Sequence, residues 1–182
     1  MLRNRLKLAA LAPLSLLLWQ CHAAEKPKAT APSPYAVSVR LAYTPMALAA
    51  LIREKDTVGV DAYYYGDPKP EAQSKADKLG RLALADELHG WSPDTRRVPF
   101  GGNIDTSLLP DLRDEPQLLV SADSIGSDGG SDQLIACKTW IGTVKNAQAK
   151  PPLIACELDT GDKDSADAII AADEASSSES SQ

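Results

Sequence analysis

Two cysteines constrain the fold of this chain more than any other feature of its sequence. Cys137 and Cys156 lie nineteen positions apart, and the polar stretch 145–150 falls near the middle of that interval. If segments 133–144 and 153–158 pair as antiparallel strands with the cysteines opposite each other, the turn falls within this polar stretch. The spacing therefore predicts a disulfide that joins two neighbouring strands, provided that the chain folds in an oxidising compartment.

The N-terminal residues 1–23 have the three-part pattern of an export signal. Three basic residues, Arg3, Arg5 and Lys7, precede an apolar run over 8–19, and small residues follow it. The run is interrupted by a proline and is shorter than the roughly 20 residues that span a membrane, so an anchor helix is not expected. The pattern predicts a signal peptide and a mature protein that is periplasmic or secreted.

Two processing routes fit this N-terminus. Cleavage after the small residues gives a mature protein that begins at Ala24 or Glu25. The alternative is lipidation at Cys21, for which Leu18 suits the lipobox, although the two residues just before the cysteine are larger than usual. The second route would anchor the protein to the cell envelope by lipid, and both routes leave the same two cysteines in the domain.

Composition divides the remaining chain into three parts. Residues 24–34 form a proline-rich linker, residues 35–158 form one domain, and residues 159–182 form a disordered acidic, serine-rich tail. The tail contains seven acids and one lysine, and the whole chain has a net charge of −6. Because acidic surfaces repel phosphate backbones, nucleic acid is not expected as a partner, and membrane contact is expected only through a lipid anchor.

Alternating apolar residues predict strands over 37–43 and 58–65. Between them, Thr44 followed by Pro45 is typical of a helix start. Further short strands are predicted near 82–85, at 96–100, at 117–122 and on both sides of the cysteine-flanked turn. The fold expected is mainly β: an antiparallel sandwich of about seven short strands with one short helix.

The best candidate for a ligand-binding surface lies on the strand over 58–65. Alternation places Tyr63 and Tyr65 on the face opposite Val60, together with Asp61 and close to the turn at 66–68. Tyrosine rings with polar tips suit the recognition of a sugar or an extended peptide. The alternative interpretation is structural, with the rings covering the second side of the sheet or packing under a loop.

Catalytic patterns are weak in this sequence. No nucleophile elbow or metal-ligand cluster stands out, so no catalytic residue, cofactor or metal is predicted. The first hypothesis is a non-catalytic binding module for an envelope or extracellular protein, a peptide or a glycan. The alternative is a small exported hydrolase that uses His89 with a nearby carboxylate such as Asp86 or Glu87.

Overall fold

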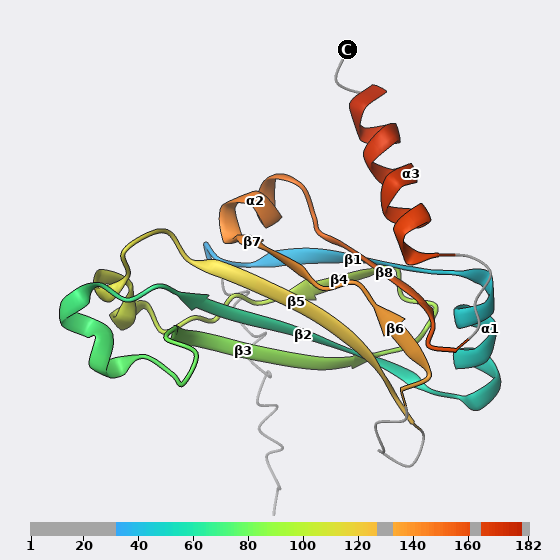
Figure 1. Cartoon of the computed structure of the whole chain (residues 1–182), viewed down its shortest axis with the longest axis horizontal. Coiled ribbons are helices and arrows are strands. Elements are labelled where there is room, and N and C mark those ends of the chain that lie inside the picture. Colours follow the sequence, from blue (N-terminus) through green and yellow to red (C-terminus); the bar gives the residue numbers. More distant parts are fainter. Residues whose placement is uncertain (1–31, 127–132, 161–164, 180–182) are drawn as a thin grey trace, which may run out of the picture. The chain divides into compact units, whose positions relative to one another are not determined.

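The computed structural model describes residues 32–126, 133–160 and 165–179. These residues form eight strands in two four-stranded sheets with mainly antiparallel pairing (Figure 1). The predicted mainly β sandwich is therefore confirmed. The signal peptide predicted over 1–23, with Cys21, lies outside the described residues, as does most of the linker predicted over 24–34.

The first sheet, sheet A, combines strands that are far apart in the sequence. Its order is β4 (Arg97–Phe100), β1 (Val37–Tyr43), β8 (Leu153–Leu158) and β6 (Ile135–Cys137). The central pair, β1 and β8, is parallel, and the two outer pairs are antiparallel.

The second sheet, sheet B, is antiparallel throughout. Its order is β3 (Leu82–Trp91), β2 (Thr57–Gly66), β5 (Gln117–Ile125) and β7 (Trp140–Thr143). The long central strands β2 and β5 pair along nine residues, and a bulge interrupts the pairing of β2 with β3 between Tyr64 and Tyr65. Strands β3 and β7 form the edges of this sheet.

The core lies between the two sheets, where their alternating apolar side chains meet. Val39 of β1, Val60 and Tyr64 of β2 and Leu118 of β5 belong to a single buried cluster, and each is fully inaccessible to solvent. Burying such side chains supplies most of the favourable free energy of a domain of this size. Because both sheets contribute one face to this core, each sheet keeps a second, outer face for other contacts.

Helix α1 (Pro45–Glu54) is the helix that the sequence predicted between the first two strands. The Thr44 side chain accepts a hydrogen bond from the Ala47 N–H at 3.2 Å, and Pro45 occupies the first turn, where its missing N–H costs nothing. The helix ends at Lys55, which has a left-handed φ of 62°. Short 3-10 turns at Pro70–Lys75 and Thr106–Asp111 connect other strands.

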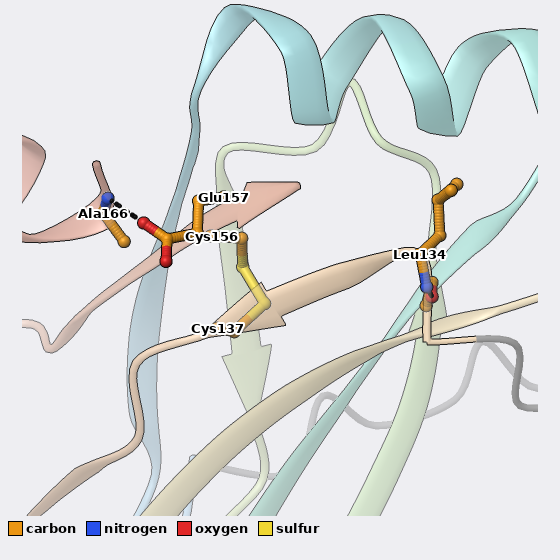
Figure 2. Close-up of a disulfide and its surroundings, with 6 residues drawn as sticks. Leu134, Cys137, Cys156, Glu157 and Ala166 are labelled. Atoms are coloured by element: carbon orange, nitrogen blue, oxygen red, sulfur yellow. Dashed lines mark hydrogen bonds between the residues drawn. A yellow bond between two sulfur atoms is a disulfide. The ribbon is translucent and has the colours of Figure 1, made fainter. Parts of the chain in front are cut away.

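The predicted disulfide is present and joins β6 to β8. Cys137 lies directly opposite Cys156 in an antiparallel pair, and their sulfur atoms are bonded (Figure 2). The longer strand predicted over 133–144 is wrong, because β7 pairs with β5 in sheet B and helix α2 (Val144–Ala149) takes the place of the turn. The chain therefore changes sheets just after Cys137.

Helix α3 (Ala166–Glu179) lies within the range 159–182 that the sequence predicted as a disordered tail. Local capping, together with ion pairs from Asp167 and Asp173 to basic residues of the domain, explains why a helix forms there. The Glu157 carboxylate accepts a hydrogen bond from the Ala166 N–H at 2.7 Å, and the Ser165 hydroxyl accepts one from the Asp167 N–H at 3.1 Å. Both bonds satisfy N–H groups that the first turn of a helix leaves unpaired.

Candidate functional site: the outer face of sheet B

The outer face of sheet B is formed by the side chains that alternate with the buried ones. Strand pairing fixes which of them are neighbours across the sheet. Asp61 of β2 lies between Leu88 of β3 and Ser121 of β5, and Tyr63 lies between Asp86 and Leu119. On the next strand, Leu119 is paired with Ile141 of β7. The residues of this face include Gly59, Asp61, Tyr63, Tyr65, Ala83, Asp86, Leu88, Gln117, Leu119, Ser121, Asp123 and Ile141.

The two tyrosines occupy the face that alternation predicted. Tyr63 and Tyr65 are half-buried on the outer face, whereas Tyr64 between them is fully buried in the core. Their rings are nearly parallel, at 15°, with centroids 5.5 Å apart. The guanidinium carbon of Arg81 lies 5.0 Å from both ring centroids, a distance at which a cation is attracted to an aromatic ring.

The connection between β2 and β3 fixes this aromatic pair in place. The Tyr63 hydroxyl donates a hydrogen bond to the Asp77 carboxylate at 3.2 Å. The same carboxylate accepts hydrogen bonds from the backbone N–H groups of Leu79 and Arg81. These bonds lower the pKa of Asp77, and the bond from Arg81 makes the largest contribution. Part of the tyrosine surface is therefore used within the protein, as the structural interpretation of these rings expected.

Asp61 is the residue of this face with the most perturbed ionisation. Burial, the hydrogen bond and charge of Asp86, and the charge of Asp123 together raise the pKa of Asp61 to about 7, and burial is the largest of these causes. One carboxyl oxygen of Asp61 is buried without a hydrogen-bond partner among the described residues. No basic side chain is among the causes of the shift, so the acidic charge at this point is not compensated by the described part of the chain.

Exposed apolar side chains flank these carboxylates. Leu88 is 64% exposed on β3 and Ile141 is 62% exposed on β7, so the two edge strands of sheet B each present a large apolar group to solvent. The sequence could not place Asp86 and Leu88 beside Asp61, or Ile141 on the same sheet face, because these positions depend on the order of the strands. The available signal was the alternation within Gln117–Ile125, which marks Leu119 and Ser121 as outward-facing.

His89 has different surroundings from those that a hydrolase would need. Its ring stacks on Phe100 with centroids 5.8 Å apart and meets Trp91 edge-on. Both oxygens of Glu87 accept backbone N–H groups of the loop after β4, while Asp86 lies on the other face of β3, next to Tyr63. The two carboxylates nearest in sequence are therefore engaged elsewhere.

Within residues 32–126, 133–160 and 165–179, no three His, Cys, Asp or Glu side chains, Asp61, Asp86 and Asp123 among them, are arranged to hold a metal ion. Of the helices described, none combines the length and the apolar character needed to cross a membrane.

No protein-family model matches the chain, and neither does any curated protein or solved structure. Function is therefore inferred from the fold and the surface of the described residues. They define a small β-sandwich domain with an intramolecular disulfide, which is compatible with an exported domain.

Proposed function

We propose that this protein is an exported, non-catalytic binding module whose binding surface is the outer face of sheet B. The partner is an extended, basic segment of an envelope or extracellular protein. One observation carries the proposal: exposed Leu88 lies directly beside the half-buried carboxylate of Asp61, and exposed Ile141 lies on the other edge strand of the same face, across β5. Apolar contacts surrounding a few fixed charges are the usual composition of a protein-binding surface.

The charge of the face favours a basic partner. The charges of Asp86 and Asp123 repel the ionised carboxylate of Asp61, and this repulsion contributes to the raised pKa of Asp61. A lysine or arginine brought to these carboxylates would relieve the repulsion and would favour the ionised form of Asp61. A second copy of the same face would add like charges, which disfavours self-association through this surface.

The geometry favours an extended segment over a sugar. Strand β3 is an edge of sheet B, and Asp86 and residues 88–90 within it are exposed. An exposed strand edge offers unpaired backbone groups to which a partner strand can add, with its alternate side chains lying over the sheet face. A sugar would instead need open, flat ring faces, whereas Tyr63 and Tyr65 face each other and share Arg81.

In this proposal Tyr63, Tyr65 and Asp61 are ligand-binding residues, as predicted from the sequence, and they lie on the central strand β2 of the binding face. Asp86 and Leu88 extend the face toward the edge of β3, where the Leu84 carbonyl already accepts a hydrogen bond from the Asp105 N–H at 2.9 Å. The hydrolase alternative gains no support from the surroundings of His89, which packs against aromatic rings.

The test uses a fluorescent peptide of about ten residues that alternates lysine and valine, the length of a long strand. We expect the purified chain to bind it, and we expect a matched peptide that alternates glutamate and valine not to bind. The double substitution D61N and D86N should weaken binding by about tenfold or more, as expected for two charge-assisted contacts. Asp114→Asn serves as the matched control, because Asp114 is exposed in the loop before β5.

Three results would refute the proposal. Equal binding of the basic and acidic peptides would remove the charge argument. Unchanged affinity of the double variant would show that the peptide binds elsewhere, and binding of neutral oligosaccharides in place of the basic peptide would assign the face to a different class of ligand.

A further inference from the structure

Basic side chains gather on the opposite side of the molecule, at the outer face of sheet A. Arg40 projects from β1 between the buried Val39 and Leu41 and therefore points away from the core. Together with Lys138 and Lys150 it lines a cavity of about 180 Å³, whose other walls include Trp140, Pro151 and Leu153 and, on α3, Ile170, Asp173 and Glu174. We call the surface against which α3 lies the sheet A groove; it is formed by Arg40, Lys138, Trp140, Lys150, Pro151 and Leu153.

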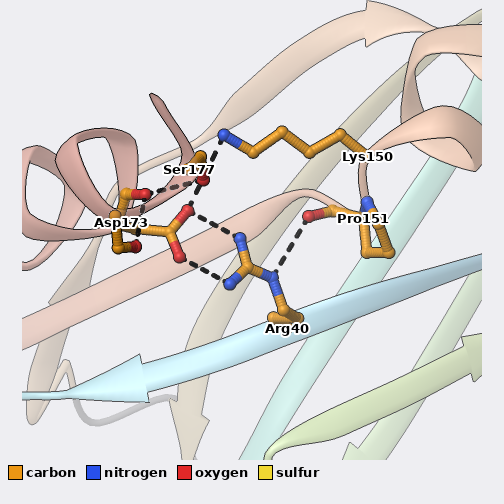
Figure 3. A network of polar contacts seen from close by, with 6 residues as sticks. Arg40, Lys150, Pro151, Asp173 and Ser177 are labelled. Carbon is orange, nitrogen blue, oxygen red and sulfur yellow. Dashed lines mark hydrogen bonds and ion pairs between the residues drawn. The ribbon is translucent and has the colours of Figure 1, made fainter. Parts of the chain in front are cut away.

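The acidic side chains of α3 occupy this groove. The two terminal nitrogens of Arg40 donate to the two carboxylate oxygens of Asp173 at 2.6 and 2.7 Å, while its Nε donates to the Pro151 carbonyl at 3.3 Å (Figure 3). Lys150 lies 3.9 Å from the same carboxylate, and Lys138 pairs with Asp167 at 3.1 Å. Arginine in this two-point geometry recognises a carboxylate as a chemical group, whichever chain supplies it.

Few apolar contacts hold α3 in the groove. Ala166 is its buried residue, whereas Ile169 and Ile170 are only half-buried. The remaining attachment consists of ion pairs. The Lys138 and Asp167 side chains are 44% and 74% exposed, and an exposed pair of this kind adds little net stability. The Arg40 and Asp173 side chains are 29% and 20% exposed and pair at two points, so this is the contact that a competing acidic segment has to replace.

We propose that the sheet A groove is a binding site for an acidic helical segment of a partner protein, and that α3 is its intramolecular competitor. The presence of α3 shows that a helix with carboxylates at positions equivalent to Asp167 and Asp173 fits the groove. The groove and the outer face of sheet B belong to different sheets and prefer partners of opposite charge. The inference therefore stands independently of the function proposed above.

The test uses the full chain and a labelled synthetic peptide with the sequence of residues 165–182. Asp173→Asn removes the carboxylate that Arg40 holds and should release α3. We expect this variant to bind the peptide about tenfold or more tightly than the wild-type chain, and we expect added salt to weaken the complex. Glu174→Gln is the matched control, because Glu174 is exposed and lines the same cavity, so the variant removes the same charge while the ion pair of Asp173 with Arg40 stays in place.

Two further measurements keep the result interpretable. Hydrogen exchange should become faster at the amides of α3 in the D173N chain and should stay unchanged in the E174Q chain. Arg40→Met, combined with D173N, should abolish the gain in peptide affinity, with Lys150→Met as a second variant in case the first does not fold.

Equal peptide affinity of the wild-type and D173N chains would overturn the proposal, as would an affinity gain that survives the loss of both Arg40 and Lys150. Formation of a heterodimer between the wild-type and D173N chains would identify α3 of a second copy as the occupant and would overturn the assignment to a partner protein.

Discussion

Asp61→Asn should stabilise the protein at neutral and higher pH. The substitution replaces a half-buried carboxylate by an uncharged group of nearly the same size, and the new amide can donate a hydrogen bond to Asp86. In the folded protein, burial and the charges of Asp86 and Asp123 raise the pKa of Asp61 from its ordinary 3.8 to about 7. The folded state therefore holds a proton on Asp61 that the unfolded chain releases at a lower pH.

The sign of the effect follows from proton linkage. Between about pH 4 and about pH 7, the folded state binds more protons than the unfolded state, so the free energy of unfolding falls as the pH rises. Each pH unit between the two pKa values corresponds to about 1.4 kcal/mol, which gives an upper limit of about 4 kcal/mol. Because Asp61 is partly exposed, solvent screening reduces this value, and we expect a gain of about 1 to 2 kcal/mol for D61N at about pH 8.

Urea denaturation followed by tryptophan fluorescence, repeated from about pH 4 to about pH 8, measures the effect. The curves of D61N and wild type should converge at the acidic end and separate steadily toward the alkaline end. D114N, which changes an exposed aspartate in the loop before β5, should follow wild type throughout. Parallel pH profiles for D61N and wild type would refute the assignment of the raised pKa to Asp61.

Three other outcomes are expected. Replacing Cys137 and Cys156 together by serine should lower the free energy of unfolding by about 2 to 5 kcal/mol, and a non-reducing peptide map of the native protein should recover both cysteine peptides as one species. Tyr64→Phe should leave the free energy of unfolding unchanged or raise it by about 1 kcal/mol in the same urea assay. The reason is that the Tyr64 hydroxyl is buried without a hydrogen-bond partner among the described residues. A loss of more than about 1 kcal/mol would show that the hydroxyl has a partner. Intact-mass measurement of protein from its native compartment should give a chain that begins at Ala24 or the next residue, whereas a lipid-modified Cys21 or an unprocessed N-terminus would contradict simple secretion.

Local sequence patterns predicted the elements of this fold better than their arrangement. Alternation identified β1 and β2, because each of these strands buries one face, and the pair Thr44 and Pro45 identified the start of α1. The distribution of strands between two sheets depends on long-range pairing, which alternation does not encode. The spacing of the two cysteines predicted the disulfide and its register. The crossing of the chain to sheet B at β7 was not predicted, because it depends on long-range pairing.

The candidate site shows the same division between local and long-range information. The common face of Tyr63 and Tyr65 follows from the period of a strand and needs no further knowledge. Asp86 lies close to Asp61 only because of the register of β3 against β2. The position of α3 depends on the contact between Arg40 and Asp173, which are 133 residues apart in the sequence. Such contacts leave no periodic signal in a single sequence.

The central claim is that the outer face of sheet B binds an extended basic segment. A titration of the isotope-labelled chain with the alternating lysine and valine peptide, followed by amide chemical shifts in NMR spectra, tests this claim most directly. We expect the largest shift changes at Asp61, at Asp86–Gly90 of β3 and at the outward residues of β5, with little change in sheet A. Shift changes confined to the sheet A strands, or none at peptide concentrations of about 1 mM, would contradict the account.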